Sequence, residues 1–363
     1  MTARILSIGT ALPETRLSQE QVRDFFAAQP GTDRLTARLI HAAFDAAAID
    51  QRHTVLAEFA DGGRGEFIDA DGRLRHPTTA QRNAAYTALA PPLSATAARE
   101  ALSDAALPPA AVTHVVTVSC TGFFAPGPDY RLVRDLGLEP PVERYNLGFI
   151  GCAAALPALR FAAHITEADP AAVVLIVCTE LCSLHIRASS DPQQIVAASV
   201  FADGTAAVVV AGGAVAGARP GLDLDRFGTA LTTEGEEDMV WTIGDHGFEM
   251  TLSAEVPRII GREIRAALTG FLGDDRPDAW AVHPGGRSVL DRVERGLALD
   301  PAALHASRDV LRDFGNMSSA TVLFILRRLM HDTTIPGDAR LAALAFGPGL
   351  TVESALLTKR GPA

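Results

Sequence analysis

Short apolar runs alternate with longer stretches of helical periodicity along most of the chain. This alternation is typical of an α/β protein, in which strands form a central sheet and helices cover its faces. In the first half, the apolar runs predict strands at residues 4–11, 114–120, 145–150, 171–178 and 205–211. Helical periodicity predicts helices within residues 18–48, 78–106, 130–136, 152–163 and 195–201.

Two stretches of the first half are expected to depart from this regular pattern. The helix within residues 78–106 is expected to break at Pro91 and Pro92, because proline lacks a backbone donor and clashes with the preceding turn. Residues 61–77 are rich in glycine, aspartate and arginine, which predicts an exposed loop or hairpin.

The second half repeats the pattern of the first. It contains predicted strands at residues 279–283, 341–346 and 350–357, and predicted helices at 288–297 and 318–330. A segment rich in glycine and alanine, residues 212–221, could join the two halves. We therefore expect two domains, residues 1–215 and 216–363, each a layered αβαβα unit, related by a pseudo-two-fold axis.

Four residues occupy matching positions in the two halves. Cys152 lies 32 residues after Cys120, and Asn316 lies 33 residues after His283. All four stand at the carboxyl ends of predicted strands or at the helices that follow them, where ligands and catalytic groups gather in α/β sheets. Packing about a two-fold axis would bring Cys152, His283 and Asn316 together.

Each member of this trio also has a simpler interpretation. Cys152 follows Gly151 where a predicted strand turns into a helix, and a helix N-terminus stabilises the thiolate that attacks carbonyl carbon. Taken singly, however, it could be a buried structural cysteine. His283 could be a structural or surface histidine, and Asn316 a helix N-cap. The symmetric placement of the three residues favours a joint chemical role.

The residue types of the trio suit carbon–carbon bond formation. A thiolate paired with an imidazolium is a ready nucleophile, while an imidazole and an amide can hydrogen-bond a carbonyl oxygen as it becomes an enolate. The trio contains no carboxylate. Decarboxylation of a malonyl thioester is favoured in such an uncharged, apolar site, because loss of CO2 removes a poorly solvated charge.

Composition narrows the classes of protein that remain. The 363 residues carry a net charge of -11, so nucleic-acid binding is not expected. The four cysteines form no CxxC pair and have no histidine at ligand spacing, which argues against a disulfide framework or a metal site. The sequence shows neither a signal peptide nor a membrane span, so we expect a soluble cytoplasmic protein.

Five motifs, in order along nearly the whole chain, resemble those of the type III polyketide synthases, the chalcone and stilbene synthase family. They are Gly151-Cys-Ala-Ala154, Val200-Phe-Ala-Asp-Gly204, His283-Pro-Gly-Gly286, Gly315-Asn-Met-Ser-Ser-Ala320 and Phe346-Gly-Pro-Gly-Leu-Thr-Val-Glu353. The resemblance implies the thiolase fold, a homodimer, and iterative condensation of malonyl-CoA onto an acyl-CoA starter. CoA thioesters would be the substrates, and no separate cofactor would be needed.

The resemblance also implies roles for individual residues. Cys152 resembles the nucleophile that holds the growing chain, and His283 and Asn316 resemble the pair that activates it and stabilises the enolate. Phe201 and Phe248 match two gatekeepers between the CoA tunnel and the cavity, although composition alone would also fit core residues. Positions that line the family's cavity correspond here to Cys120, Thr121, Ala125, His185, Met239 and Ser318.

Several positions depart from the plant members of the family. His185 could narrow the cavity, orient a product for cyclisation, or only satisfy a neighbouring carbonyl. Ala125 replaces a bulky residue that reaches across the dimer. The helix that carries phosphate-binding Lys and Arg in plant enzymes here reads Ile40-His-Ala-Ala-Phe-Asp-Ala46, with basic groups nearby only at Arg34, Arg38 and Arg52.

The product class is also an expectation from resemblance. Residues 239–252 resemble bacterial members that make alkylpyrones or alkylresorcinols from fatty starters. Two alternatives share the fold. One is the initiating ketoacyl synthase of fatty-acid synthesis, which condenses once onto a carrier protein. The other is a non-catalytic thiolase-fold partner that only binds acyl groups or a second subunit.

Overall fold

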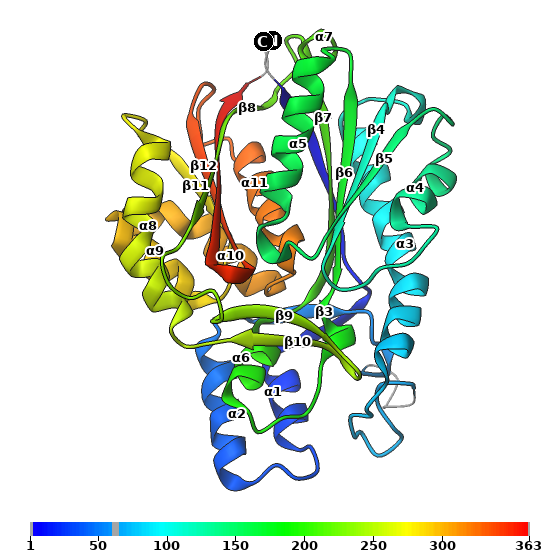
Figure 1. The fold of residues 1–363 in the computed structure, drawn as a ribbon, viewed down its shortest axis with the longest axis vertical. Helices are drawn as coiled ribbons and strands as arrows, with labels where there is room; N and C mark the ends of the chain where they lie inside the picture. Colours follow the sequence, from blue (N-terminus) through cyan, green and yellow to red (C-terminus); the bar gives the residue numbers. More distant parts are fainter. Residues whose placement is uncertain (1–2, 60–64, 362–363) are drawn as a thin grey trace.

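The computed structural model describes residues 3–59 and 65–361. A nine-stranded sheet runs through this part of the chain (Figure 1). In spatial order its strands are β11 (Ala279–Val282), β12 (Arg340–Gly347), β13 (Thr351–Arg360), β8 (Gly221–Leu231), β1 (Arg4–Ala11), β7 (Asp203–Ala211), β6 (Val173–Leu181), β4 (His114–Ser119) and β5 (Glu143–Gly148).

The sheet consists of two similar halves that meet at β1 and β8. These two strands pair at only two positions, Arg4 with Asp223 and Ile5 with Leu222. Moving outward from the junction, the first half adds β7 antiparallel, β6 antiparallel and β4 parallel. The second half adds β13 antiparallel, β12 antiparallel and β11 parallel. The pairing sequence is the same in both halves, as the predicted duplication requires. β5 has no counterpart in the described second half.

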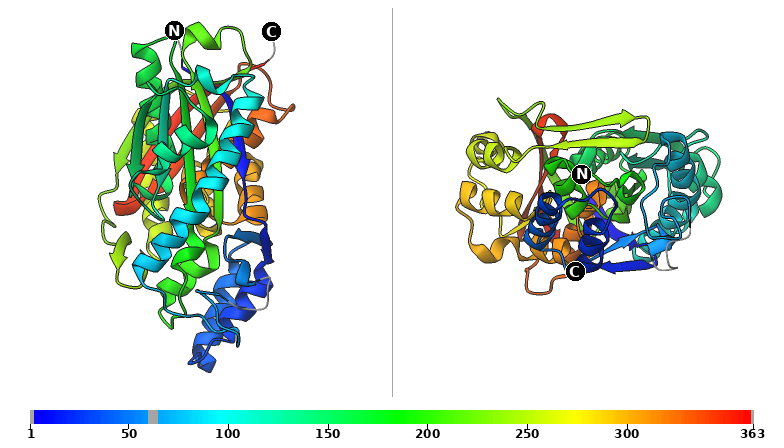
Figure 2. Two further views of the ribbon diagram at one scale, coloured as in Figure 1. Left: turned by 90° about the vertical axis from the view of Figure 1, so that its right-hand side faces the viewer. Right: turned by 90° about the horizontal axis from the view of Figure 1, so that it is seen from below.

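Helices cover the sheet in layers. Those of the described residues are α1 (Gln19–Ala27), α2 (Arg34–Ala46), α3 (Thr79–Asp104), α4 (Pro128–Leu136), α5 (Ala155–Ala168), α6 (Pro192–Val200), α7 (Gly213–Ala216), α8 (Val256–Leu272), α9 (Arg287–Leu297), α10 (His305–Phe314) and α11 (Thr321–His331). Helices α5 and α11 lie between the two half-sheets, whereas α3 with α4, and α8 with α9, cover the opposite outer faces (Figures 1 and 2).

Separate hydrophobic clusters hold these layers together. The central cluster joins α5 and α11 to the inner faces of both half-sheets. A second cluster packs α8 and α9 on the outer face of the second half, and a third packs α3 on the outer face of the first. The αβαβα layers are therefore present, and the two halves form them together. The predicted domain boundary between residues 215 and 216 falls inside α7 and stays a prediction.

The predicted break at Pro91 and Pro92 does not occur. Helix α3 continues through both prolines as a single helix of 26 residues. Its alanine face, including Ala97 and Ala101, is buried against the sheet. We attribute the continuity to this packing, because burial of a long apolar face can outweigh the backbone hydrogen bonds that two prolines remove.

The expected loop at residues 61–77 is described only from residue 65 onward. In that part, Ile68 and Leu74 form an antiparallel bridge, as in a hairpin. Residues 61–64 lie outside the described residues.

The segment between residues 221 and 272 contains elements that we did not predict from the sequence. It forms β8, an antiparallel hairpin of β9 (Met239–Gly244) and β10 (Gly247–Leu252), and α8. The hairpin crosses below the central layer in Figure 1. A small sheet of β2 (Thr15–Ser18) and β3 (Gln51–Thr54) flanks α1 and α2. Within the described ranges, each helix is too short or too polar to cross a lipid bilayer.

Candidate active site

Cys152 is placed by a sharp turn between β5 and α5. After β5 the backbone takes positive φ angles at Phe149 (59°) and Gly151 (73°), and residues Gly151–Ala153 form a 3-10 turn before α5 begins. A Cβ atom at residue 151 would overlap Cδ of Pro348, so only glycine fits there. The turn presents Cys152 beside the sheet with 8% of its surface exposed.

Asn316 is placed by an equivalent turn in the second half. Gly315, directly before it, also has a positive φ angle (72°), and a Cβ atom there would lie 3.1 Å from Cβ of Ala202. The backbone of Asn316 bridges to Phe201, with the Asn316 N–H donating to Val200 O at 2.8 Å. Both halves therefore place a glycine of positive φ directly before the residue presented, after strand β5 in the first half and after helix α10 in the second.

These turns and the end of β11 meet at an outer chamber of about 590 Å³. Cys152, His283 and Asn316 all line it, together with parts of α2, α6, α8, α9 and the β9–β10 hairpin. The structure thus brings together the three residues that the duplicated pattern predicted.

His283 is buried, with 1% of its surface exposed, and neither ring nitrogen has a hydrogen-bond partner among the described residues. Such an unsatisfied buried group is unusual and calls for a functional explanation. Its backbone is held by donation from the His283 N–H to Leu344 O at 2.8 Å. The imidazole is therefore fixed in position while its two nitrogens stay available to a substrate.

The side chain of Asn316 is oriented by its neighbours. Its Oδ1 accepts a hydrogen bond from the backbone N–H of Ser318 at 2.9 Å, while its Nδ2 has only a long contact of 3.5 Å to Gly285 O. The amide therefore offers the chamber its NH2 group, which is a donor. That is the group needed to stabilise negative charge on an oxygen.

Burial decides the protonation of the site. It raises the pKa of the Cys152 thiol to about 11, although hydrogen bonds from Ser318 and Asn316 partly offset the rise. Burial also lowers the pKa of His283 to about 3. Burial therefore favours the neutral forms of both groups, and the expected thiolate–imidazolium pair stays a prediction. His283 lines the same chamber as Cys152 and is the candidate acceptor for the proton of its thiol.

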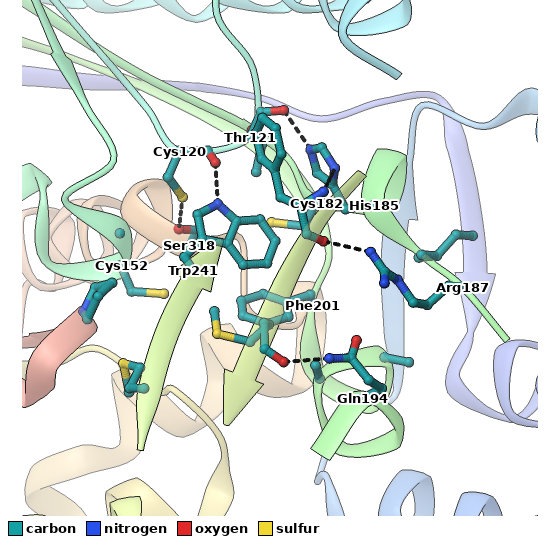
Figure 3. Close-up of a pocket in the computed structure, with 18 residues that line it drawn as sticks. Cys120, Thr121, Cys152, Cys182, His185, Arg187, Gln194, Phe201, Trp241 and Ser318 are labelled. Atoms are coloured by element: carbon teal, nitrogen blue, oxygen red, sulfur yellow. Dashed lines mark hydrogen bonds between the residues drawn. The ribbon is translucent and has the colours of Figure 1, made fainter. Parts of the chain in front are cut away.

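An inner chamber of about 60 Å³ lies beyond the outer one. Figure 3 shows the thiol of Cys152 and the ring of Phe201 at this chamber. Four residues line both chambers and so form their boundary: Cys152, Phe201, Met239 and Met250. The inner chamber is small because aromatic side chains from η4 (Cys182–His185) and the β9–β10 hairpin close it.

His185 belongs to this aromatic wall. Its ring stacks on Phe248 with centroids 4.2 Å apart and meets Trp241 edge-on at 5.7 Å. The Phe248 N–H donates to Nδ1 at 3.0 Å, so the ring proton is on Nε2, which contacts Thr121 O at 2.8 Å. Both ring nitrogens of His185 are therefore hydrogen-bonded to backbone groups. The ring narrows the chamber and satisfies a carbonyl, and no nitrogen is left to orient a product.

A buried carboxylate lies behind Cys152. Glu180 accepts hydrogen bonds from Thr121 Oγ1 at 2.8 Å and Ser319 Oγ at 2.5 Å, and burial raises its pKa. Cys120 Sγ lies 3.6 Å from Glu180 and 3.3 Å from Ser318 Oγ.

Most of the other predicted site residues lie at the inner chamber. Cys120, Thr121, Phe201, Phe248, His185, Met239 and Ser318 all line it. Phe248 lines only the inner chamber, whereas Met250 lines both, and the gatekeeper role of Phe248 stays a prediction. Ala125 lines neither chamber and contributes to a separate groove beside α3. Its predicted role across a dimer is untested.

Sequence reasoning missed several lining residues. Trp241, Met250 and Cys182 line the inner chamber, and Arg258, Arg287 and Arg292 line the outer one. Trp241 donates from Nε1 to Cys120 O at 2.6 Å, which fixes its ring across the chamber. Alternation in the β9–β10 hairpin could have pointed to Trp241, Phe248 and Met250, but that hairpin was not predicted.

Comparison with known proteins assigns this geometry to a family. Residues 1–214 match the family described as chalcone and stilbene synthases, N-terminal domain, and residues 228–360 match the corresponding C-terminal domain. The chain belongs to the chalcone and stilbene synthase family.

Individual relatives agree with this family. Bisdemethoxycurcumin synthase of Oryza sativa subsp. japonica is 33% identical over 373 residues, covering 98% of this chain and 92% of the relative. Probable polyketide synthase 1 of Dictyostelium discoideum is 30% identical over 372 residues, covering 97% of this chain. The chain spans only 11% of that second relative's length.

Solved structures of the family have the same fold. PKS-I from the brown alga Ectocarpus siliculosus matches with a TM-score of 0.90 at 28% identity, covering 99% of this chain and 98% of that one. The C-terminal type III polyketide synthase domain of Steely1, a type I/III hybrid from Dictyostelium, matches with a TM-score of 0.86 at 29% identity, covering 99% and 100%.

This chalcone and stilbene synthase family member is therefore a type III polyketide synthase of thiolase fold, an acyl-transferring condensing enzyme. The fold and enzyme class inferred from the five motifs are confirmed. The family assignment favours this class over the carrier-protein-dependent initiating synthase and the non-catalytic partner. The bacterial-type subfamily stays a prediction.

Proposed function

We propose that this polyketide synthase extends a small acyl-CoA starter with malonyl-CoA on Cys152 and releases a short pyrone or phenolic product. The observation that carries the proposal is the outer chamber, where Cys152, the unsatisfied imidazole of His283 and the amide of Asn316 face one space. CoA thioesters supply all the reacting groups, so the cycle needs no separate cofactor.

The cycle begins with acyl transfer. His283 takes the proton of the Cys152 thiol, and the sulfur attacks the thioester carbon of the starter. The bond to the CoA sulfur breaks, and CoA leaves with the proton that His283 held. Neither ring nitrogen of His283 has a partner among the described residues, so the imidazole has a free acceptor for this proton, and the negative charge that develops on the sulfur stabilises the imidazolium.

Malonyl-CoA then loses CO2 beside the same two donors. The electron pair of the broken C–C bond moves onto the thioester, whose oxygen becomes an enolate. The Nδ2 group of Asn316 and a ring N–H of His283 can hydrogen-bond that oxygen. The enolate carbon attacks the acyl group on Cys152, the cysteine sulfur leaves, and the extended chain remains on CoA until it returns to Cys152.

The inner chamber supports a short product. Pockets for drug-sized ligands enclose about 300–1,000 Å³, whereas this chamber holds about 60 Å³. Trp241, His185 and Phe248 close its far side. These dimensions favour a small starter and few extensions over the fatty starter suggested by the resemblance of residues 239–252.

A homodimer is part of the proposal. β5 is an edge strand whose side chains are mostly exposed, and Tyr145 and Phe149 on or beside it are 36% and 37% exposed. Phe123, 47% exposed, packs on both Phe149 and Phe248, which connects this surface to the inner chamber. Light scattering on the purified protein should give twice the mass of the chain, and a monomeric mass at micromolar concentration would contradict this part of the proposal.

The proposed function is tested by mass spectrometry of products made from malonyl-CoA and starters of increasing size. We expect acetyl-CoA and other short starters to give ketide products and long-chain acyl-CoAs to give little. Preferential use of a long-chain starter would overturn the assignment of a short product. Activity only with malonyl carrier protein would overturn the CoA-dependent mechanism.

A further inference from the structure

The outer chamber has one wall without charge and one wall rich in arginine. The wall from α2 presents Ala43, Ala46 and Ala47. The opposite wall, from the start of α8 and the start of α9, presents Arg258, Arg287 and Arg292, with Asp291 the one acidic residue among those that line the chamber. In a chain of net charge -11, this is a local concentration of positive charge.

The basic residues near α2 do not serve this chamber. Arg34 and Arg38 are exposed and do not line it. Arg52 is buried and donates to Gln19 Oε1 and to the carbonyl oxygens of Ala198 and Phe201, so its guanidinium is occupied by the protein itself. The arginine side chains that an anionic ligand in the chamber can contact therefore lie on the α8–α9 wall.

Arg292 is the best placed of the three arginines. Its side chain lies across Gly261 of α8, where an added Cβ would come within 3.2 Å of its Cδ, so its stem is held by packing between the helices. Within the described chain it forms no ion pair, whereas Arg258 pairs with Glu255, and Arg287 has Asp291 at 3.7 Å. Asp291 itself is paired with Arg308 at 2.8 Å.

We propose that Arg292, assisted by Arg287 and Arg258, binds the phosphate groups of the CoA thioester on the α8–α9 wall. The inference rests on the proposed function and adds the site that recognises the nucleotide end of the substrate. The pantetheine arm then runs along the chamber toward Cys152, which lines the same space. Guanidinium groups suit this role, because they donate several hydrogen bonds to phosphate oxygens in a fixed geometry.

The test is isothermal titration calorimetry with two probes, coenzyme A and pantetheine, which lacks the nucleotide and its phosphates. Arg292→Gln keeps the stem and removes the charge. It should weaken CoA binding about tenfold, as expected for loss of a charge-assisted hydrogen bond, and leave pantetheine binding unchanged. Arg287→Ala, at an exposed position, should weaken CoA binding less. Higher salt should narrow the difference between wild type and variants.

Two controls make the outcome specific. Arg262→Ala removes an exposed arginine of α8 that pairs with Glu234 and does not line the chamber, and it should leave CoA binding unchanged. The double variant Arg34→Ala/Arg38→Ala tests the α2 side. Loss of CoA affinity in that variant, or unchanged CoA affinity in both Arg292→Gln and Arg287→Ala, would overturn the inference. Equal loss of CoA and pantetheine binding in Arg292→Gln would also overturn it.

These results are separate from a failure of the proposed function. A folded wild-type protein that binds neither CoA nor pantetheine would count against CoA-dependent chemistry altogether. The wild type could instead bind CoA and condense malonyl-CoA while the arginine variants do the same with equal CoA affinity. That result would contradict only the placement of the CoA phosphates on the α8–α9 wall.

Discussion

The outer and inner chambers differ in almost every physical property, although Cys152, Phe201, Met239 and Met250 line both. The outer chamber is wide, about 590 Å³, and combines the reactive trio with an arginine wall. The inner one is about 60 Å³ and is closed by Trp241, His185 and Phe248. The outer chamber has the parts needed to bind and activate thioesters, and the inner one has the parts that limit the size of a product.

Because different parts of the fold build the two chambers, the reaction and the size of the product can be changed separately. The outer chamber is built by the turns at Gly151 and Gly315, at equivalent places in the two halves of the fold. The inner chamber is closed by η4 and the β9–β10 hairpin, which lie outside the nine-stranded sheet. Substitutions in the outer chamber should therefore change rates, and substitutions in the inner one should change product length.

The largest expected effect comes from removal of the thiol. Cys152→Ala should lower product formation by at least about a thousandfold, because no other group takes over the nucleophile. Product analysis measures the loss, and circular dichroism checks the fold. Loss of folded protein would indicate a structural cysteine, and retained product would contradict the mechanism.

Loss of the Asn316 amide should slow decarboxylation of malonyl-CoA more than acylation of Cys152. Asn316→Ala should lower malonyl-CoA decarboxylation by about a hundredfold, the usual cost of one oxyanion donor. Acylation of Cys152 by a starter should change much less. Release of CO2 and the mass of the intact protein separate the two steps. An equal loss in both would mean that Asn316 mainly supports the position of Cys152.

The raised pKa of Cys152 predicts a particular pH dependence of thiol alkylation. Burial raises the pKa of Cys152 to about 11, so the reactive thiolate fraction should rise about tenfold per pH unit between pH 7 and 10. Peptide mapping after brief treatment with iodoacetamide measures this at each cysteine. Cys152 should react first, because burial raises the pKa of Cys120 and Cys182 further. A plateau already at pH 7 would instead show a preformed thiolate–imidazolium pair.

In the inner chamber, Trp241→Ala should lengthen the product. The indole lies across the chamber and is held by its hydrogen bond to Cys120 O, so its removal opens space next to Phe248. We expect products about one or two ketide units longer, at a rate within about tenfold of wild type. Shorter products, or the same products, would mean that the boundary residues set the length.

His185→Ala should have the smallest effect on product length. The imidazole also lines the chamber, but its loss removes two hydrogen bonds to backbone and the stack on Phe248. We expect a modest shift to longer products and a free energy of unfolding lower by about 1–3 kcal/mol. Mass spectrometry and denaturant unfolding measure the two quantities. An unchanged product profile would assign His185 a purely structural role.

Much of the outer chamber could be predicted from sequence, because its residues follow the duplication. The similar spacings from Cys120 to Cys152 and from His283 to Asn316 reflect equivalent strands in the two halves. The alternation of apolar runs and helical periodicity predicted the strands of the first half-sheet and most strands of the second. It did not foresee that burial would raise the pKa of Cys152 and lower that of His283, because desolvation depends on the three-dimensional surroundings.

The inner chamber and the arginine wall were less predictable. Trp241 and Met250 belong to a hairpin with no counterpart in the other half, and Phe248 was placed at the boundary only by resemblance. Arg258 and Arg292 stand on amphipathic helices, where an exposed arginine is common, and only packing shows that they face a chamber. At Pro91 and Pro92 the local preference of proline predicted a break in helix α3, but tertiary packing keeps the helix continuous.

Covalent catalysis by Cys152 can be followed by intact-protein mass spectrometry during turnover. Wild-type protein is incubated with a short acyl-CoA and then with malonyl-CoA, with Cys152→Ala as the control. If Cys152 carries the growing chain, the wild-type protein should first show an acyl adduct and then adducts longer by successive ketide units. The Cys152→Ala control should show no adduct. A folded wild-type dimer that shows no adduct, or an equal adduct on the control, would contradict covalent catalysis by Cys152.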